Sequence, residues 1–335
     1  MTHSTSTSTS TSTSTSTDTS TDTSTAPVAA VFLSVLDAVE WREPRTVAVH
    51  GADGTAEVDL AGVRAVPELR RVLYEAFHSG RPATAANADP DEDFLRLLTG
   101  SVRVPFSEDS GWRVIGPPSG GAVSVERDGI RMTIDPARHL APGTPSGDGA
   151  VVTVRMPPCR PNISPGFFSV VGSRAPEGPL VRFYLNLPCD SVAAFVTGAT
   201  ERLEAAGVRY TMKTLADPRA YGRRDGTVIY TEARFRAAVI AVLGEVLPEL
   251  PVPARFDLPP LTERVLPQAG FAEEPLDGGG ARLSFGDQRC DTVARVLAGN
   301  HGRPVHELYA PLAAELTSRG IDPLAPHRNL PGDDA

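Results

Sequence analysis

Lys213 has the clearest chemical potential in this sequence, because it is the only lysine among 32 lysine and arginine residues. Arginine stays protonated at any accessible pH, whereas burial and neighbouring cations can lower the pKa of a lysine until the amine is neutral. A neutral amine can remove a proton from carbon as a general base. Lys213 also lies in a predicted strand, Tyr210–Leu215, among apolar neighbours. The sequence therefore predicts a lysine base, and a stray lysine in an arginine-rich composition is the alternative.

Two polar residues of a second predicted strand share one face. Arg182 and Tyr184 alternate with apolar residues over Val181–Leu187, and side chains two positions apart on a strand point the same way. A β-α-β unit would bring that face beside Lys213. Further arginines follow the Lys213 strand and flank a glycine-rich stretch: Arg223, Arg224, Arg282 and Arg289. Guanidinium groups bind phosphate through two parallel hydrogen bonds, so the combination predicts a phosphate clamp, although each arginine alone is an ordinary surface group.

The second half of the chain supplies the elements that would position these residues. The predicted strands are Val151–Met156, Leu180–Leu187, Val208–Leu215 and Thr227–Thr231, and the predicted helices are Asp190–Ala206, Ala233–Leu247, Cys290–Leu297 and Pro304–Arg319. This order predicts an α+β fold in which helices flank a mixed β-sheet.

The first half divides into a tail and a region of helices. Ser4–Thr25 is a Ser/Thr repeat without an apolar residue, which predicts a disordered tail over 1–25. Apolar residues at helical spacing over Ala29–Trp41, Val66–His78 and Asp91–Leu98 predict a helix-rich region over 26–147. The chemistry is then expected within 148–331.

Composition excludes several functional classes. A formal net charge of -9 argues against a nucleic-acid surface, which needs a dense basic face. The sequence shows neither a membrane span nor a secretory signal, so we expect a cytoplasmic protein without a membrane partner. The three cysteines are far apart, which suggests neither a disulfide framework nor a zinc site.

Five short blocks of the second half resemble the HopA-type effector family in order and spacing. They are Ser164–Phe168, Val181–Leu187, Tyr210–Lys213, Tyr221–Asp225 with Val228–Tyr230, and Ser284–Arg289. Actinobacterial members of this family occur as the stand-alone lyases of class V lanthipeptide and related thioamitide biosynthesis. Because the similarity covers about Val151–Pro331, it implies that 148–331 is a HopA-like lyase domain, distantly similar to phosphothreonine lyases.

The resemblance implies a reaction and roles for residues. Related lyases remove the α-proton of a phosphorylated residue with a lysine and protonate the departing phosphate with a histidine on a Lys-x-His strand. By position, Lys213 matches the base, Arg182 the strand lysine and Tyr184 the histidine. Arg223 and Arg289 match the phosphate-binding arginines, with Arg224 and Arg282 as neighbours. Tyr184 departs from the pattern, and a phenol is a weaker acid than an imidazolium. His139 is expected to be a surface or loop residue rather than a substitute.

The implied substrate is phosphoserine or phosphothreonine in a ribosomally made precursor peptide, and the implied product is dehydroalanine or dehydrobutyrine. No metal or organic cofactor is required. The sequence lacks the nucleotide loop and the HRD and DFG motifs of a kinase, so a separate peptide kinase, and a cyclase, are the expected partners.

Three other interpretations stay open. The chain could be a catalytically inactive phosphopeptide-binding subunit that keeps the arginines but has lost the chemistry. It could be an enzyme that forms a Schiff base on its lysine. A secreted effector acting on host kinases is disfavoured by the missing amphipathic secretion region and by the actinobacterial-looking composition.

Overall fold

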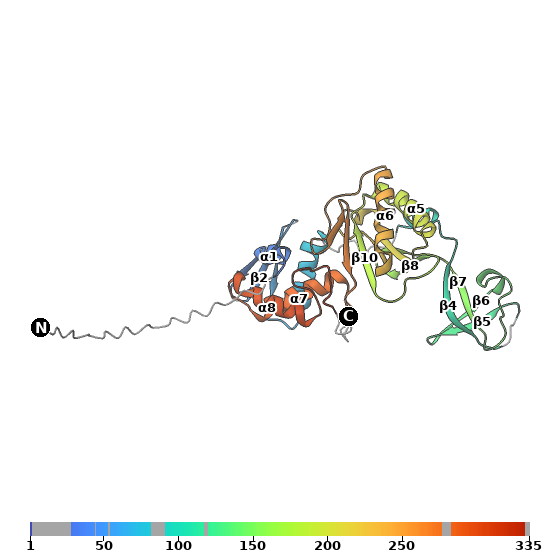
Figure 1. Cartoon of the computed structure of the whole chain (residues 1–335), viewed down its shortest axis with the longest axis horizontal. Helices are drawn as coiled ribbons and strands as arrows, with labels where there is room; N and C mark the ends of the chain where they lie inside the picture. The colour runs from blue at the N-terminus through green and yellow to red at the C-terminus, as the bar shows by residue number, and fades with distance from the viewer. Residues whose placement is uncertain are drawn as a thin grey trace.

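The computed structural model describes residues 1, 28–43, 45–52, 54–81, 91–116, 120–276 and 283–331 of the 335-residue chain. The predicted tail over 1–25, apart from Met1, lies outside these residues. Figure 1 shows three parts side by side, with α1, α7 and α8 in the first, β10, α5 and α6 in the second and β4 to β7 in the third. Within the described ranges, none of the helices combines the length and the apolar character needed to cross a bilayer.

A seven-stranded sheet forms the centre of the molecule, in the order β13-β14-β10-β12-β11-β9-β8. Its strands are β8 (Cys159–Ser164), β9 (Phe167–Val171), β10 (Leu180–Leu185), β11 (Tyr210–Leu215), β12 (Thr227–Glu232), β13 (Glu263–Leu266) and β14 (Ala269–Glu273). All of the described pairings in this sheet are antiparallel, whereas the sequence suggested a mixed sheet. The predicted α+β fold class is confirmed.

Helices cover one face of this sheet and bury every second residue of its strands. Phe183, Met212 and Ile229 lie in this core, which also contains apolar residues of α3 (Glu92–Ser101), α5 (Cys189–Ala205) and α6 (Arg236–Val246). Short 3-10 turns lie before β12 and on either side of α6: η3 (Pro218–Ala220), η4 (Ala233–Phe235) and η5 (Leu247–Glu249). The helix α5 connects β10 to β11, but β12 lies between them and antiparallel to both, so the expected β-α-β unit is split.

The opposite face of the sheet is covered by elements from both ends of the chain. The helix α2 (Ala65–Leu73) continues into a π-helix, η1 (Tyr74–Ser79). These pack with α7 (Phe285–Gly299), α8 (Tyr309–Ser318), the 3-10 turn η6 (Val305–Leu308) and α1 (Ala30–Asp37) in one apolar core. Tyr184 and Val228 of the large sheet belong to the same core. The N-terminal region is therefore packed on the sheet that carries Lys213.

A three-stranded sheet, β1-β2-β3, completes the first part of the molecule. Its strands are β1 (Val39–Arg42), β2 (Thr46–Gly51) and β3 (Gly54–Asp59). The predicted helix over Ala29–Trp41 is wrong over its last residues, because α1 ends at Asp37 and β1 follows. Val39 is buried and Trp41 half-buried while Glu40 and Arg42 face water, the alternation that a strand paired on one side allows.

A second small sheet, in the order β6-β5-β4-β7, forms the third part (Figure 1). It contains β4 (Ser107–Val114), β5 (Val123–Arg127), β6 (Ile130–Ile134) and β7 (Val151–Met156), with the short helix α4 (Pro136–His139) beside it. It has its own core around Trp112, Val125 and Val154. The described part of the region 26–147 thus holds six strands besides its helices, and β7 from beyond that boundary pairs with β4.

Candidate active site

Lys213 and Tyr184 lie on the same face of the large sheet. Val228 of β12 is the direct cross-strand partner of both, of Lys213 on one side and of Tyr184 on the other. Directly opposed residues point to the same face of a sheet, so the three form one row. Arg182 lies two residues before Tyr184 and faces Tyr230 in the next row. The antiparallel register therefore brings together the lysine, the tyrosine and the arginine that the sequence singled out.

The Lys213 ammonium lies against aromatic rings and near cations. Its Nζ is 4.3 Å from the ring centroid of Phe167 and 5.8 Å from that of Tyr230. The pKa of Lys213 is lowered from 10.5 to about 8, first by burial and then by the charges of Arg182 and Arg223, against the opposing effect of Asp225. The neutral amine that a general base requires is therefore a minor form at pH 7 and the main form above about pH 8.

Arg182 is buried and paired with a carboxylate. Its Nε and Nη2 both donate to Glu274, the latter at 2.6 Å, and its Nη1 donates to the Tyr184 hydroxyl at 3.4 Å. The guanidinium also lies over the Tyr230 ring, 5.0 Å from its centroid. Only 6% of Arg182 is exposed, so this cation is held in place beside the lysine.

Tyr184, which matches the acid of the related lyases, is almost fully buried. Burial raises the pKa of Tyr184 above its usual value of 10.0, although Arg182 opposes the shift. A phenol with a raised pKa gives up its proton less readily. The phenol of Tyr184 is therefore poorly suited to protonate a departing phosphate.

A second buried pair lies next to this row. Arg223 donates to Asp225 from Nε at 2.9 Å and from Nη2 at 2.8 Å, and the Tyr74 hydroxyl of η1 donates to the same carboxylate at 2.6 Å. Although burial alone would raise the pKa of Asp225, the hydrogen bonds and charge of Arg223 lower it from 3.8 to about 2. Arg223 is 7% exposed and interacts by charge with Lys213. Arg223 therefore lies within the cluster, and its role in binding phosphate stays a prediction.

The other predicted arginines have different surroundings. Arg224 is paired with Asp257 at 2.9 Å and donates to the backbone carbonyls of Ala76 and Phe77 in η1, so it fastens that π-helix to the loop before β12. Arg289 is fully buried, with its guanidinium 4.4 Å from the Phe285 ring centroid. It donates to Gln288 and to the C-terminal segment at Pro326, Arg328 and Asn329. Arg282 lies outside the described residues.

The structure adds a residue that the sequence did not single out, His78. It is the fifth residue of η1, is 2% exposed, and lies edge-on to Tyr184 with their ring centroids 5.3 Å apart. His78 also interacts by charge with Lys213 and Asp225. No local motif marks it, because it arrives from an element far earlier in the chain. His139, by contrast, lies in α4 beside the small sheet, away from this cluster.

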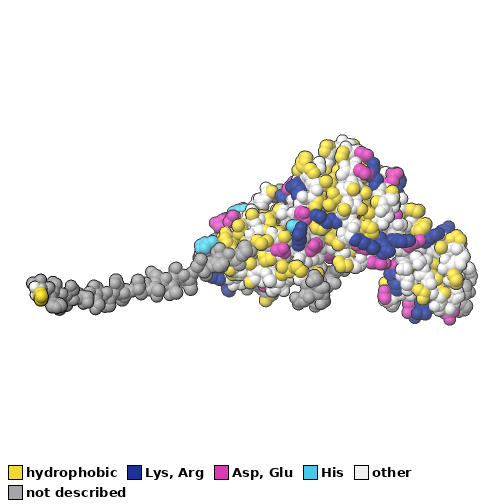
Figure 2. Space-filling model, viewed as in Figure 1, with side chains coloured by type: hydrophobic (Ala, Val, Ile, Leu, Met, Phe, Trp, Pro, Cys, Tyr) yellow, Lys and Arg dark blue, Asp and Glu magenta, His cyan; other side chains and the backbone are white. Residues whose placement is uncertain are grey.

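Figure 2 shows a broken band of lysine and arginine side chains across the visible face of the second part towards the small sheet. Arg182, Arg223 and Arg289 are buried, so they are not part of the exposed charge. Among the described residues, no group of three or more His, Cys, Asp or Glu side chains could hold a metal ion. The cluster thus consists of buried arginines, tyrosine and histidine around a lysine that is itself partly exposed.

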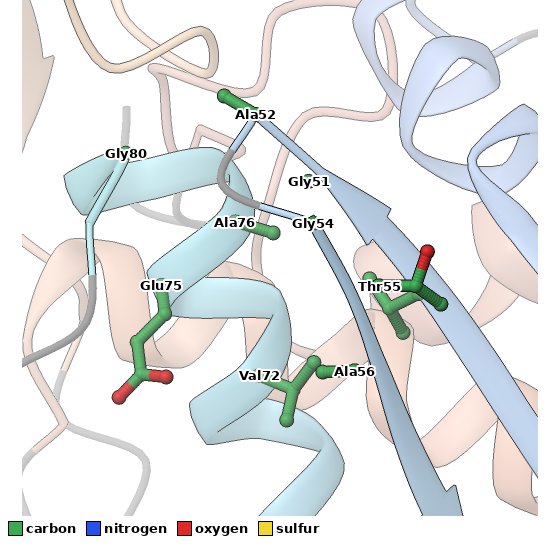
Figure 3. Close-up of a pocket in the computed structure, with 10 residues that line it drawn as sticks. Gly51, Ala52, Gly54, Thr55, Ala56, Val72, Glu75, Ala76 and Gly80 are labelled. Atoms are coloured by element: carbon green, nitrogen blue, oxygen red, sulfur yellow. The ribbon is translucent and has the colours of Figure 1, made fainter.

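A pocket of about 230 Å³ lies elsewhere, between the β2–β3 hairpin and the helix α2–η1 (Figure 3). Small residues such as Gly51, Gly54 and Ala76 line it, and the side chain of Glu75 points away from the hairpin. It lacks the convergent polar groups expected of a reaction site. We therefore take the cluster around Lys213 as the candidate active site.

Comparisons with known proteins give the family of the chain. A comparison with curated proteins finds no match. The solved structure of the effector protein from Pseudomonas syringae pv. syringae strain 61 aligns with a TM-score of 0.40 and 17% identity, over 49% of this chain and 63% of that chain. The present chain thus spans less than two thirds of that protein.

The effector protein from Pseudomonas syringae pv. tomato strain DC3000 aligns with a TM-score of 0.44 and 12% identity, over 80% of this chain and 95% of that chain. The sequence model of the HopA1 effector protein family matches residues 159–328, about half of the chain, which include all of the large sheet and confirm the HopA-type resemblance. The chain therefore belongs to the HopA1 effector protein family.

Proposed function

We propose that this protein is a carbon–oxygen lyase that eliminates phosphate from phosphoserine or phosphothreonine in a peptide. The observation that carries the proposal is the position of Lys213, the only lysine, which is half-buried on a sheet face near the buried arginines Arg182 and Arg223. A surface cation needs no such position. A general base requires it, because burial and neighbouring cations make its amine neutral.

The proposed reaction uses groups that the cluster contains. The Nζ of Lys213 takes the α-proton, the C–H electron pair forms the Cα=Cβ bond, and the Cβ–O bond breaks with its electrons going to phosphate. Arg182 and Arg223 each donate two hydrogen bonds to a carboxylate, through Nε and Nη2. Their positive charge would stabilise the departing phosphate. The product is dehydroalanine from serine or dehydrobutyrine from threonine, and no cofactor takes part.

The proposed biological substrate is a phosphorylated precursor peptide of lanthipeptide type in the cytoplasm of the producing cell. The support is the resemblance of the five sequence blocks to the lyases of those pathways and the membership of the HopA1 family. A separate kinase would supply the phosphate group, and a cyclase would consume the dehydro residue by adding a thiol. A dehydroamino acid is an electrophile, so a thiol-adding reaction is the step that follows by its chemistry.

Mass spectrometry of a phosphothreonine peptide incubated with purified protein tests this proposal. Elimination removes the mass of phosphoric acid, whereas a phosphatase would leave threonine, which is heavier by one water. A thiol added after the reaction will form an adduct only with the dehydro product. We expect elimination by the wild type and none by Lys213→Arg, which keeps the charge but cannot become neutral. Equal elimination by both proteins would refute Lys213 as the base.

A phosphopeptide-binding subunit is the second candidate, and the burial of Tyr184 favours it. A site without a competent acid could retain its arginines for binding alone. Isothermal titration with the intact phosphopeptide separates the two candidates, since a binding subunit will bind the peptide unchanged, and Lys213→Arg will bind it equally well. Turnover by the wild type would exclude this candidate.

A further inference from the structure

His78 is a buried histidine with an unused hydrogen-bonding atom. It is 2% exposed, and its Nδ1 is buried without a hydrogen-bond partner. Buried polar groups are nearly always paired, because an unpaired one loses its bonds to water without replacement. The unpaired Nδ1 of His78 therefore does not stabilise the fold, and its presence in this charged cluster indicates a functional role.

The helix α7 is shaped to receive the ring of His78. A Cβ placed on Gly286 would lie 2.5 Å from His78 Cδ2 and 2.7 Å from its Nε2, distances that real side chains do not show. Only glycine lets the imidazole lie this close to the first turn of α7. Phe285 beside it contributes a ring whose centroid is 5.9 Å from that of the imidazole. The Ser284–Arg289 block therefore contains the residues that contact His78, which lies about 200 positions earlier in the chain.

Groups from four elements face the imidazole. Tyr74 of η1 and Tyr184 of β10 lie 4.8 Å and 5.3 Å from it, centroid to centroid. The charges that act on His78 are those of Asp225, Arg182, Arg223 and Lys213, from the loop before β12 and from β10 and β11. The pKa of His78 is lowered from 6.5 to about 4, mainly by burial and also by the three cations, against the opposing effect of Asp225. The imidazole is thus neutral in the free protein.

We propose that His78 is the general acid of the elimination, in place of Tyr184. This inference rests on the proposed function. A phosphate ester entering the cluster brings up to two negative charges, which favour protonation of the imidazole. As the Cβ–O bond breaks, the imidazolium gives its proton to the bridging oxygen. Hydrogen phosphate departs, His78 is neutral again, and the proton taken from carbon stays on Lys213 until water removes it.

The nature of the leaving group distinguishes an acid from a packing residue. Phosphate leaves as a strongly basic anion unless it is protonated, whereas sulfate leaves without a proton. A peptide with O-sulfoserine keeps a tetrahedral anion for the arginines and removes the need for the acid. The variant His78→Phe keeps an aromatic ring among Tyr74, Tyr184 and Phe285 but has no proton to give.

We therefore propose to measure elimination from matched phosphoserine and O-sulfoserine peptides by wild type, His78→Phe, His78→Gln and Lys213→Arg. We expect His78→Phe and His78→Gln to lose roughly 100-fold in kcat on phosphoserine, with less than about threefold loss on sulfoserine. Lys213→Arg should be inactive on both peptides. Activity on sulfoserine also shows that a variant is folded.

An equal fractional loss on both peptides, or no loss on either, would overturn the assignment of His78 as the acid. Failure of the proposed function gives a different result, because the wild type itself would then leave the phosphoserine peptide unchanged. The thermal unfolding midpoint gives an independent readout. Since His78→Phe removes an unpaired buried nitrogen, we expect that midpoint to stay the same or rise, and a sharp fall would assign His78 to the fold instead.

Discussion

At Lys213, two features of the surroundings act on the same equilibrium. The rings of Phe167 and Tyr230 cover part of the ammonium group, and the buried cations Arg182 and Arg223 repel it. Both disfavour the charged amine relative to the neutral one. Asp225 and Glu274 act the other way, but each is hydrogen-bonded to an arginine. The pKa of the lysine is thus lowered by burial and by two arginines, each held in place by a hydrogen-bonded carboxylate.

The first prediction concerns pH. Because the base is active only when neutral and its pKa is about 8, elimination from the O-sulfoserine peptide, which needs no acid, should rise tenfold in rate per pH unit below that value and level off above it. A stopped assay of dehydro product from about pH 6 to pH 10 will measure the profile. A rate that falls as the pH rises through 8 would contradict a lysine base.

The second prediction concerns Asp225. Asp225→Asn removes the charge that pairs with buried Arg223, so we expect the free energy of unfolding at neutral pH to fall by roughly 3–5 kcal/mol. In the wild type the paired carboxylate stabilises the fold fully above its unfolded pKa of 3.8, and that contribution is lost as the pH falls towards 2. Urea unfolding of both proteins will measure this. Glu57→Gln, at the exposed pair with Arg42, is the control and should change little.

At the scale of elements, the start of α7 combines a capped end with a close approach. The Ser284 hydroxyl accepts from the backbone N–H of Asp287 at 3.2 Å, which satisfies a donor that the first turn leaves free. Gly286 lies two residues further on, against His78. The cap at Ser284 therefore defines where α7 begins, and Gly286 in its first turn allows η1 to approach closely.

The third prediction tests this contact with two glycine substitutions in helices. Gly286→Ala should lower the free energy of unfolding by roughly 1–3 kcal/mol, because the new methyl group must displace the imidazole or the helix. Gly244→Ala is the matched control, since Gly244 is exposed in α6 and its Cβ would meet nothing within 4 Å. It should raise that free energy by about 0.5–1 kcal/mol. Thermal unfolding of the two variants compares them, and a stabilising Gly286→Ala would exclude the close contact.

At the scale of the whole molecule, one apolar core contains residues from both ends of the chain, whereas the small sheet of β4 to β7 has a separate core. Residues of α2, α7 and the large sheet, such as Leu69, Val293 and Tyr184, share a single apolar core. The small sheet of β4 to β7 has a separate one around Trp112. The stability of the N-terminal elements and that of the C-terminal elements should therefore depend on each other. The stability of the small sheet should not depend on either.

The fourth prediction follows from these cores. Ser107 and Met156 are direct partners at the base of the β4–β7 pair, so a short Gly-Ser linker can replace residues 108–155. We expect the shortened protein to keep a cooperative unfolding transition and Lys213-dependent elimination. Removal of 28–81 should abolish cooperative unfolding, because it strips α2 and η1 from Tyr184 and Phe285. Differential scanning calorimetry of both deletions will decide, and a stable protein without 28–81 would contradict the shared core.

What could be predicted from the sequence was local. Alternation along β10 placed Arg182 and Tyr184 on one face, and the strand and helix order gave the α+β class and most elements of the second half. His78 could not be found in this way, because its role depends on a contact with residues far along the chain. The partners of Arg224 were equally hidden, since Asp257 and the carbonyls of η1 are far from it in sequence. The periodicity of side chains predicts which residues share one face of a strand or helix. It does not predict which distant elements pack against that face.

The widened turn of η1 makes the active site sensitive to chain length at one point. A π-helix holds one more residue per turn than an α-helix, and α2 runs into η1 without a break. Its last carbonyls are bound by Arg224, and Gly80 ends it in the left-handed conformation at φ 72°. Deleting a single residue here would remove the widened turn and shift the backbone that carries His78. The place of His78 beside Tyr184 thus depends on the number of residues in this one turn.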